Sequence, residues 1–128
     1  MITFIIVSHS FKISDGIVDM ISQMVPSESV TLVSAGGSED GSIGTDPLRI
    51  QTYVEQHRES ERIYLFGDIG SSIMSIDMVL SLIDDDLRSK CFYVDAPIVE
   101  GAFVAAVQCM VDANHEAILR EVKKTKSD

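Results

Sequence analysis

The sequence predicts an α/β domain, with a doubly wound, mostly parallel open sheet and helices on both faces. Four short apolar runs alternate with four longer segments that carry apolar residues at helical spacing, which gives the order βαβαβαβα. The first run is apolar almost throughout, as in a strand buried on both faces of a parallel sheet. The length of 128 residues suits one domain, so we expect a single domain over residues 1–128.

The first strand and helix follow from the apolar pattern at the start of the chain. Residues 2–8 (ITFIIVS) are a β-branched and aromatic run, which favours a strand. Residues 11–24 repeat apolar side chains every three or four positions, and Pro26 ends that helix. Residues 29–34 (SVTLVS) predict a second, shorter strand.

A glycine-rich stretch over residues 35–47 then interrupts the alternation. It holds four glycines and several turn-forming residues, and loops of this length in compact domains tend to be functional or mobile. Its end predicts a helix start, with Thr45 or Asp46 as the N-cap and Pro47 as the first helical residue. That helix is expected to run to about His57.

The second half of the chain repeats the alternation twice. Residues 62–67 (RIYLFG) predict a third strand, which a tight turn over residues 68–72 joins to a helix over 73–86. Residues 90–95 (KCFYVD) predict the fourth strand. The last helix is expected over roughly 100–122, where lysines at the C-terminal end suit the helix dipole.

The charge balance limits the classes of partner. The formal net charge is −10, whereas binding to nucleic acid or to an anionic membrane surface needs a basic surface. The same charge permits a protein partner with a basic face, because opposite fields speed encounter. We therefore expect no nucleic acid and no membrane among the partners.

The cysteines indicate the compartment. Cys91 and Cys109 lie in separate apolar stretches without metal-ligand spacing, so two buried thiols in a reducing, cytoplasmic compartment are the simplest interpretation. The apolar start MITFIIVSHS carries no basic segment and is too short to span a bilayer, which predicts no signal peptide.

The strand ends are the expected place for chemistry, because ligands of open α/β sheets bind beyond the carboxyl ends of the strands. This rule selects the segments Ser8–Ser10, Ser34–Thr45, Gly67–Ser72 and Asp95–Gly101. His9 is the most informative residue among them, since a histidine there can be a nucleophile, a general base or a ligand. The alternative is a loop histidine bonded to a backbone carbonyl. His57 and His115 are expected on solvated helix faces.

Asp68 is the expected partner of His9. It follows the third strand, which often neighbours the first in a doubly wound sheet. A carboxylate that accepts a hydrogen bond from one ring nitrogen fixes the tautomer and leaves the other nitrogen free as a nucleophile. An aspartate that only caps the following helix is an equally open interpretation.

Gly70, Ser71 and Ser72 open the helix after Asp68. Backbone amides and small hydroxyl groups at a helix start suit a phosphoryl group, although the serines can also be simple N-caps. No Gly-Lys-Ser/Thr follows, and the loop glycines lack dinucleotide-binding spacing. A phosphate site beside a histidine suggests transfer through a phosphohistidine, with no metal cluster among the residues and no cofactor.

Four stretches, in order along nearly the whole chain, carry a resemblance to a known family. They are VSHS at 7–10, AGGSEDGSIGTDPLRIQ at 35–51, FGDIGSSIMS at 66–75 and APIVEGAFVAAV at 96–107. On these motifs the chain resembles the DhaM family, the phosphotransferase subunits of PEP-dependent dihydroxyacetone kinases, which have the mannose-type enzyme IIA fold. Ser75 departs from the family's pattern, which has asparagine there.

The resemblance implies roles and partners that composition does not show. His9 matches the phosphorylated histidine, and Asp68 matches the carboxylate that orients it. The implied donor is the histidine phosphocarrier protein, HPr. The implied acceptor is ADP on a DhaL-type subunit, which serves a DhaK-type subunit that binds dihydroxyacetone. Members of this fold are commonly homodimers, and this chain resembles their single-domain form.

Three alternatives stay open on the sequence. The chain could be a mannose-type enzyme IIA component for sugar uptake, or a non-catalytic flavodoxin-like module that binds an anion or nucleotide. It could also be a receiver-like domain phosphorylated on aspartate. The last alternative lacks the acidic pair expected after the first strand, where this chain has Ser8-His9-Ser10.

Overall fold

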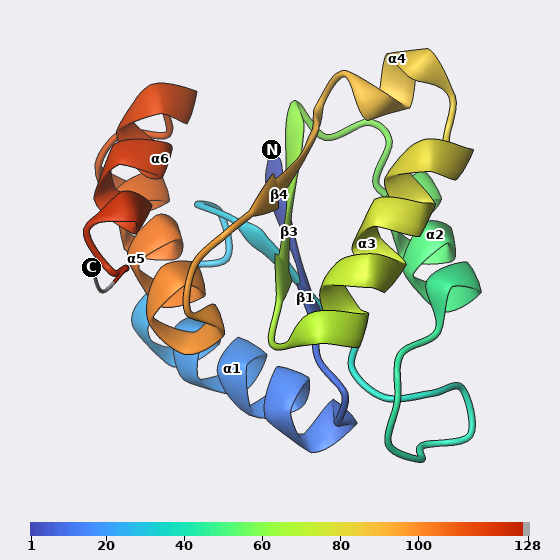
Figure 1. Ribbon diagram of the computed structural model, residues 1–128. Coiled ribbons are helices and arrows are strands. Elements are labelled where there is room, and N and C mark those ends of the chain that lie inside the picture. Colours follow the sequence, from blue (N-terminus) through green and yellow to red (C-terminus); the bar gives the residue numbers. More distant parts are fainter. Residues whose placement is uncertain (127–128) are drawn as a thin grey trace.

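The computed structural model describes residues 1–126 and contains one parallel four-stranded sheet in the order β2-β1-β3-β4 (Figure 1). The strands are β1 (Ile2–Val7), β2 (Thr31–Ser34), β3 (Arg62–Gly67) and β4 (Cys91–Val94). The helices are α1 (Phe11–Met24), α2 (Pro47–Gln56), α3 (Gly70–Leu82), α4 (Asp85–Arg88), α5 (Ile98–Val111) and α6 (His115–Lys123). Within the described residues, no helix is both long and apolar enough to cross a membrane.

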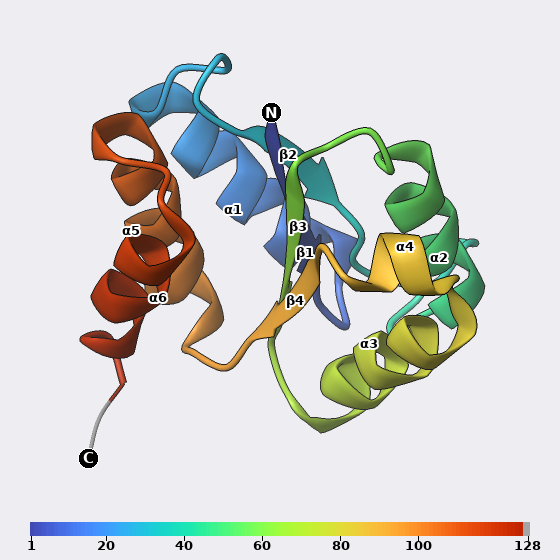
Figure 2. The ribbon, with the colours of Figure 1, turned by 90° about the horizontal axis from the view of Figure 1, so that it is seen from above.

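Helices cover both faces of the sheet, as Figures 1 and 2 show. Helices α1, α5 and α6 enclose one apolar core with Phe4, Tyr64 and Phe66 of the sheet. Helices α2, α3 and α4 enclose the other core with Ile5 and Leu65. Side chains alternate between the faces along each strand, and the central strands β1 and β3 are buried on both faces, so their residues are mostly apolar. The predicted doubly wound α/β fold is confirmed.

The pairing of β1 with β3 decides where the site forms. The register runs from Ile2 opposite Arg62 to Val7 opposite Gly67, so the two strands end side by side. The segment after Val7 therefore begins next to the segment after Gly67. The expectation that the first and third strands are neighbours is confirmed.

Two predicted helices are each divided in the structure. The helix expected over 73–86 begins earlier, at Gly70, and ends at Leu82, and the Asp84 carboxylate then accepts the Leu87 N–H (2.9 Å) to start the short α4. The helix expected over 100–122 is α5 and α6, because Asn114 caps a new helix start. Polar capping residues inside an apolar pattern mark both interruptions.

His57 and His115 are both half-buried, so the expectation of solvated positions is wrong for both residues. His115 contacts the sheet. Its Nδ1 lies 2.7 Å from the Tyr64 hydroxyl, and its ring centroid lies 4.3 Å from that of Phe92. Burial and the nearby Arg62 lower the pKa of His115. The helix pattern could not show this, because the tyrosine comes from a strand 51 positions away.

Both cysteines are buried and free, as expected. Burial raises the pKa of Cys91 and of Cys109 to about 11. Each thiol therefore stays protonated at neutral pH and packs as a small apolar group.

Candidate functional site

His9 lies at the carboxyl end of β1, between the strand and the Ser10 N-cap of α1. Its Nδ1 is 3.0 Å from Oδ1 of Asp68, and its backbone N–H donates to Oδ2 of the same carboxylate (3.0 Å). The His9 side chain is 22% exposed and that of Asp68 is 13% exposed. The aspartate thus holds both the ring and the backbone of a histidine that a partner can still reach.

The state of Asp68 decides which ring nitrogen of His9 is free. Burial alone would raise the pKa of Asp68, but hydrogen bonds from Ser72, from the His9 and Ile69 backbone and from the His9 ring outweigh it and lower the pKa. The carboxylate is therefore ionised at neutral pH and accepts a hydrogen bond from the Nδ1–H of His9. The neutral ring then carries its lone pair on Nε2.

The helix-start residues have three different positions. The Ser71 hydroxyl hydrogen-bonds Nε2 of His9. The fully buried Ser72 hydroxyl instead donates to Asp68 and lies 3.2 Å from Nδ1 of His9. Gly70 is exposed and begins α3. The sequence groups these three residues as one phosphoryl site, but the structure places them differently. Ser71 contacts Nε2, Ser72 supports the carboxylate, and Gly70 is an exposed backbone position.

Asp68 makes contacts that fit both interpretations of its role. Its Oδ1 accepts the N–H of Ile69 (2.8 Å), the residue before α3, so it also stabilises the turn into that helix. The remaining contacts are with His9 and Ser72. An aspartate that served only as a cap would not be turned toward an imidazole.

The glycine-rich loop packs against the histidine segment through contacts that the sequence analysis missed. The Gly44 N–H donates to the His9 carbonyl (2.8 Å). Arg49 of α2 donates through Nη1 to the carbonyls of Gly36 (2.7 Å) and Gly37 (3.3 Å). Arg49 lies inside a family motif, but no local signal shows that its guanidinium turns back to the loop.

Gly36 is needed where this loop begins, so Gly36→Ala is expected to lower the free energy of unfolding by about 1–3 kcal/mol. An added Cβ would lie 2.5 Å from the Ser10 carbonyl oxygen and 2.7 Å from Oγ of Ser8. Gly16→Ala is the matched control, because nothing lies within 4 Å of its added Cβ and it is inside α1. It should stabilise the protein by about 0.5–1 kcal/mol. Denaturant unfolding measures both, and equal changes would contradict the prediction.

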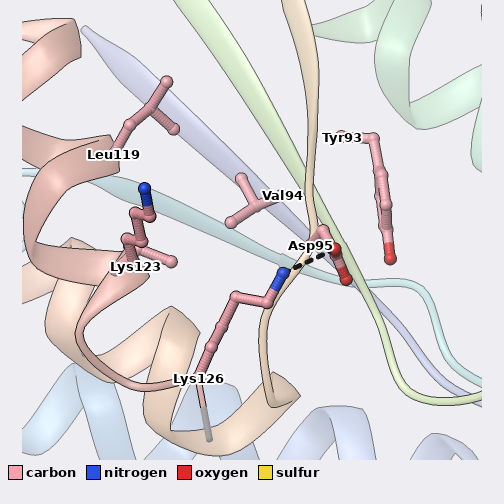
Figure 3. A pocket seen from close by; sticks show the side chains of 7 residues that line it. Tyr93, Val94, Asp95, Leu119, Lys123 and Lys126 are labelled. Carbon is pink, nitrogen blue, oxygen red and sulfur yellow. Dashed lines mark hydrogen bonds and ion pairs between the residues drawn. The ribbon is translucent and has the colours of Figure 1, made fainter. Parts of the chain in front are cut away.

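A separate cavity of about 500 Å³ lies between β4 and α6. Figure 3 shows that Tyr93, Val94 and Asp95 line it from the strand side, with Lys126 reaching Asp95 (2.8 Å). It contains neither His9 nor Asp68. The charges of Lys126 and Asp95 balance each other in an exposed ion pair. The cavity therefore offers no reactive group comparable with His9.

The contacts that hold the His9 ring come from Asp68, Ser71 and Ser72. Among residues 1–126, no three His, Cys, Asp or Glu side chains gather closely enough to hold a metal ion. His9 lies at the end of a doubly wound sheet, with Nδ1 against Asp68 and Nε2 against Ser71. This combination is typical of carriers that take up a group on histidine and pass it on.

The chain belongs to the EIIA-man family, described as PTS system fructose IIA component, which matches residues 3–119. It is similar to proteins named DhaM, as the sequence motifs predicted. Over 122 residues it is 47% identical to "PEP-dependent dihydroxyacetone kinase 2, phosphoryl donor subunit DhaM" of Listeria innocua, covering 95% of this chain and 97% of that protein.

Two further DhaM relatives differ in length. The chain is 32% identical to the "PTS-dependent dihydroxyacetone kinase, phosphotransferase subunit DhaM" of Lactococcus lactis, covering 94% of this chain and 92% of that protein. It is 35% identical to a Providencia stuartii phosphoryl donor subunit DhaM, covering 97% of this chain but only 26% of that protein.

A solved structure also shares the whole fold. The crystal structure of a protein described as of unknown function superposes with a TM-score of 0.89 and 34% identity. It covers 99% of this chain and 96% of the other.

Proposed function

We propose that this chain is the phosphoryl-carrier subunit of a PEP-dependent dihydroxyacetone kinase, with His9 as its phosphorylated residue. The contact of Asp68 with Nδ1 carries the proposal, because it leaves Nε2 as the free nucleophile. The DhaM names of the relatives supply the pathway. HPr is the proposed donor, and ADP on a DhaL-type subunit is the proposed acceptor in the cytoplasm.

The proposed transfer takes place in two steps at Nε2 of His9. The Nε2 lone pair attacks the phosphorus of the donor's phosphohistidine, an N–P bond forms on His9, and the donor ring recovers its electron pair. An oxygen of the ADP β-phosphate then attacks the same phosphorus, and Nε2 recovers its lone pair as the P–O bond forms. Asp68 keeps the Nδ1 proton in place and stabilises positive charge on the ring in both steps.

The start of α3 would stabilise the transferred group. The Ser71 hydroxyl already contacts Nε2, and it can turn to donate to a phosphoryl oxygen once that nitrogen is bonded to phosphorus. The first N–H groups of a helix, here those of Gly70 and Ser71, have no acceptor within the helix and attract an anion. Ser72 acts one step away, by holding Asp68.

The surface around His9 suits protein partners. Exposed apolar side chains flank it from three segments: Phe11 at the start of α1, Ile43 beside Gly44, and Ile69 beside Asp68. Direct transfer between two histidines needs contact between two proteins, and an apolar surface with a polar margin provides it. The net charge of −10 suits donors and acceptors with basic faces.

A second copy of the chain is the proposed partner of the outer face of α3. Met74, Met78 and Leu82 are exposed at four-residue spacing, while Ile76 and Val79 bury the inner face. A helix that carries apolar rows on its outer as well as its inner face is usually covered on both sides. A symmetric homodimer would cover this stripe. Analytical ultracentrifugation tests it, since the wild type should sediment as a dimer and Met78→Lys as a monomer.

Phosphoryl transfer measured in two stages tests the proposed function. In the first stage, PEP, enzyme I and HPr are expected to add one phosphoryl group to the chain, which intact mass measures. The adduct should be acid-labile and stable in alkali. In the second stage, the phosphorylated protein is mixed with a DhaL-type subunit and ADP, and ATP formation is measured.

The two stages separate the alternatives. Uptake of the group followed by ATP formation supports the proposal. Uptake with transfer only to a sugar-permease component would instead identify a sugar-uptake subunit. A ligand bound without any covalent adduct would identify a binding module, and both of these results overturn the proposal.

A further inference from the structure

We propose that Thr45 is a positioning residue of the site, acting through a hydroxyl pair with Ser75. The pair joins the glycine-rich loop to α3 and so keeps Ser71 in place against His9. This inference rests on the proposed function, since it assigns Thr45 to the same phosphoryl transfer.

The contact itself joins two segments that are distant in sequence. Oγ1 of Thr45 lies 2.7 Å from Oγ of Ser75, and either oxygen can donate. Ser75 is only 7% exposed. Oγ1 of Thr45 also lies 3.5 Å from the carbonyl oxygen of Ser71, one turn earlier in α3. One threonine hydroxyl therefore touches the helix at two successive turns, and one of them carries the serine that contacts Nε2.

The residue before Thr45 contacts the other half of the site. The Gly44 N–H donates to the carbonyl of His9 (2.8 Å). Two consecutive residues of the loop thus hold the backbone of the histidine and the first two turns of α3. The distance between Nε2 of His9 and the Ser71 hydroxyl depends on both halves staying together.

The chain after Thr45 makes this segment rigid. Asp46 is the N-cap of α2, and its side chain accepts the N–H groups of Leu48 (3.1 Å) and Arg49 (3.4 Å). Pro47, the first residue of α2, fixes its own φ. Thr45 therefore approaches α3 from an anchored helix start, which is how a positioning contact keeps its geometry.

The pair also gives Ser75 a physical role. The Ser75 side chain is only 7% exposed, and its hydroxyl has a close partner in the half-buried Thr45. Loss of the Thr45 hydroxyl leaves the buried Ser75 hydroxyl without this partner, and loss of the Ser75 hydroxyl leaves Thr45 with only its longer contact to the Ser71 carbonyl. The loop would then move relative to α3, and displacements of about 1 Å in an active site can slow a reaction by about 100-fold.

The test compares four variants in the HPr-dependent uptake assay. Thr45→Val removes the hydroxyl at constant shape, Ser75→Ala removes its partner, and the double variant removes both. Each should lower kcat about tenfold with little change in the KM for phospho-HPr, because the apolar docking residues are untouched. The double variant should be no slower than the slower single variant. Thr45→Ser, which keeps the hydroxyl, should transfer at close to the wild-type rate.

Thr52→Val is the matched control. Its hydroxyl is exposed and bonds only within α2, to the Leu48 carbonyl (2.9 Å). This variant should behave as wild type. If Thr45→Val keeps the wild-type kcat, or if Thr52→Val slows transfer equally, the positioning role is wrong.

A second readout does not need activity. The ¹⁵N chemical shift of Nε2 in His9 reports its contact with the Ser71 hydroxyl, and it should change in Thr45→Val and in Ser75→Ala but not in Thr52→Val. A wild type that accepts no phosphoryl group would overturn the proposed function, while this shift would still test the positioning. Unchanged shifts in both folded variants would overturn the inference.

Discussion

His9→Gln is expected to lose phosphoryl uptake by a factor on the order of 10³ or more. Glutamine is polar and close in size, but its amide nitrogen has no available lone pair to attack phosphorus. The loss should be in chemistry and not in folding, because the backbone N–H of residue 9 can still donate to Asp68. Intact mass after incubation with PEP, enzyme I and HPr measures the uptake.

His57→Gln is the matched control for this change. His57 is half-buried at the end of α2, and its Nδ1 lies 2.8 Å from the Tyr53 carbonyl. This variant should be phosphorylated as fast as the wild type, and thermal unfolding should show that both variants are folded. Normal uptake by His9→Gln would disprove the central assignment.

Asp68→Asn is expected to slow uptake by about 10³- to 10⁴-fold, the range seen when an orienting carboxylate is lost from a histidine constellation. The amide is the same size, but its NH₂ group can donate to Nδ1 of His9. The ring proton would then move to Nε2, where it blocks the nucleophile. Initial rates of uptake measure the loss, and ¹⁵N spectra of the His9 ring should show the exchanged tautomer.

The same variant has a pH signature. The pKa of Asp68 in the folded protein is below its ordinary value of 3.8. At pH values near and below 3.8, the unfolded chain therefore binds more protons at this residue than the folded chain does. The carboxylate therefore stabilises the fold above pH 3.8, and this contribution is lost as the pH falls through the folded pKa. The difference in unfolding free energy between wild type and Asp68→Asn should narrow as the pH falls below 3.8.

Asp84→Asn is the matched control for Asp68→Asn. It also replaces an aspartate that caps a helix, but it leaves the tautomer of His9 unchanged. Asp84 caps α4 and pairs with Arg58, and hydrogen bonds from Arg58 hold its pKa below the ordinary value. It has no contact with His9. Its asparagine variant should keep the wild-type rate of uptake. Equal rates in Asp68→Asn and the wild type would show that Asp68 serves the turn into α3 alone.

Much of the site could be predicted because its members follow strands. An apolar run followed directly by polar residues marks a strand end, and His9, Asp68 and the start of α3 all have this placement. The three residues Gly70, Ser71 and Ser72 look equivalent in sequence, however. Only the rotation of α3 about its axis turns Ser71 to Nε2 and Ser72 to Asp68.

The contacts that sequence reasoning missed are all long-range and polar. The sequence suggests Thr45 only as a helix cap, yet its hydroxyl reaches Ser75, 30 positions away. Arg49 reads as an ordinary helix residue, yet it holds two loop carbonyls. Hydrogen bonds of this kind depend on single side-chain rotamers, and they leave no periodic pattern along the chain.

The sequence alone predicts the α/β class, a candidate site at the strand ends, and His9 as the central residue of that site. These follow from apolar periodicity, which each segment carries locally. Only the folded structure shows that β1 and β3 end together, that Asp68 contacts Nδ1 of His9, and that Nε2 faces Ser71 instead. The reason is physical, because the tautomer of a histidine depends on which oxygen lies 3.0 Å from which nitrogen, and only the folded chain sets that distance.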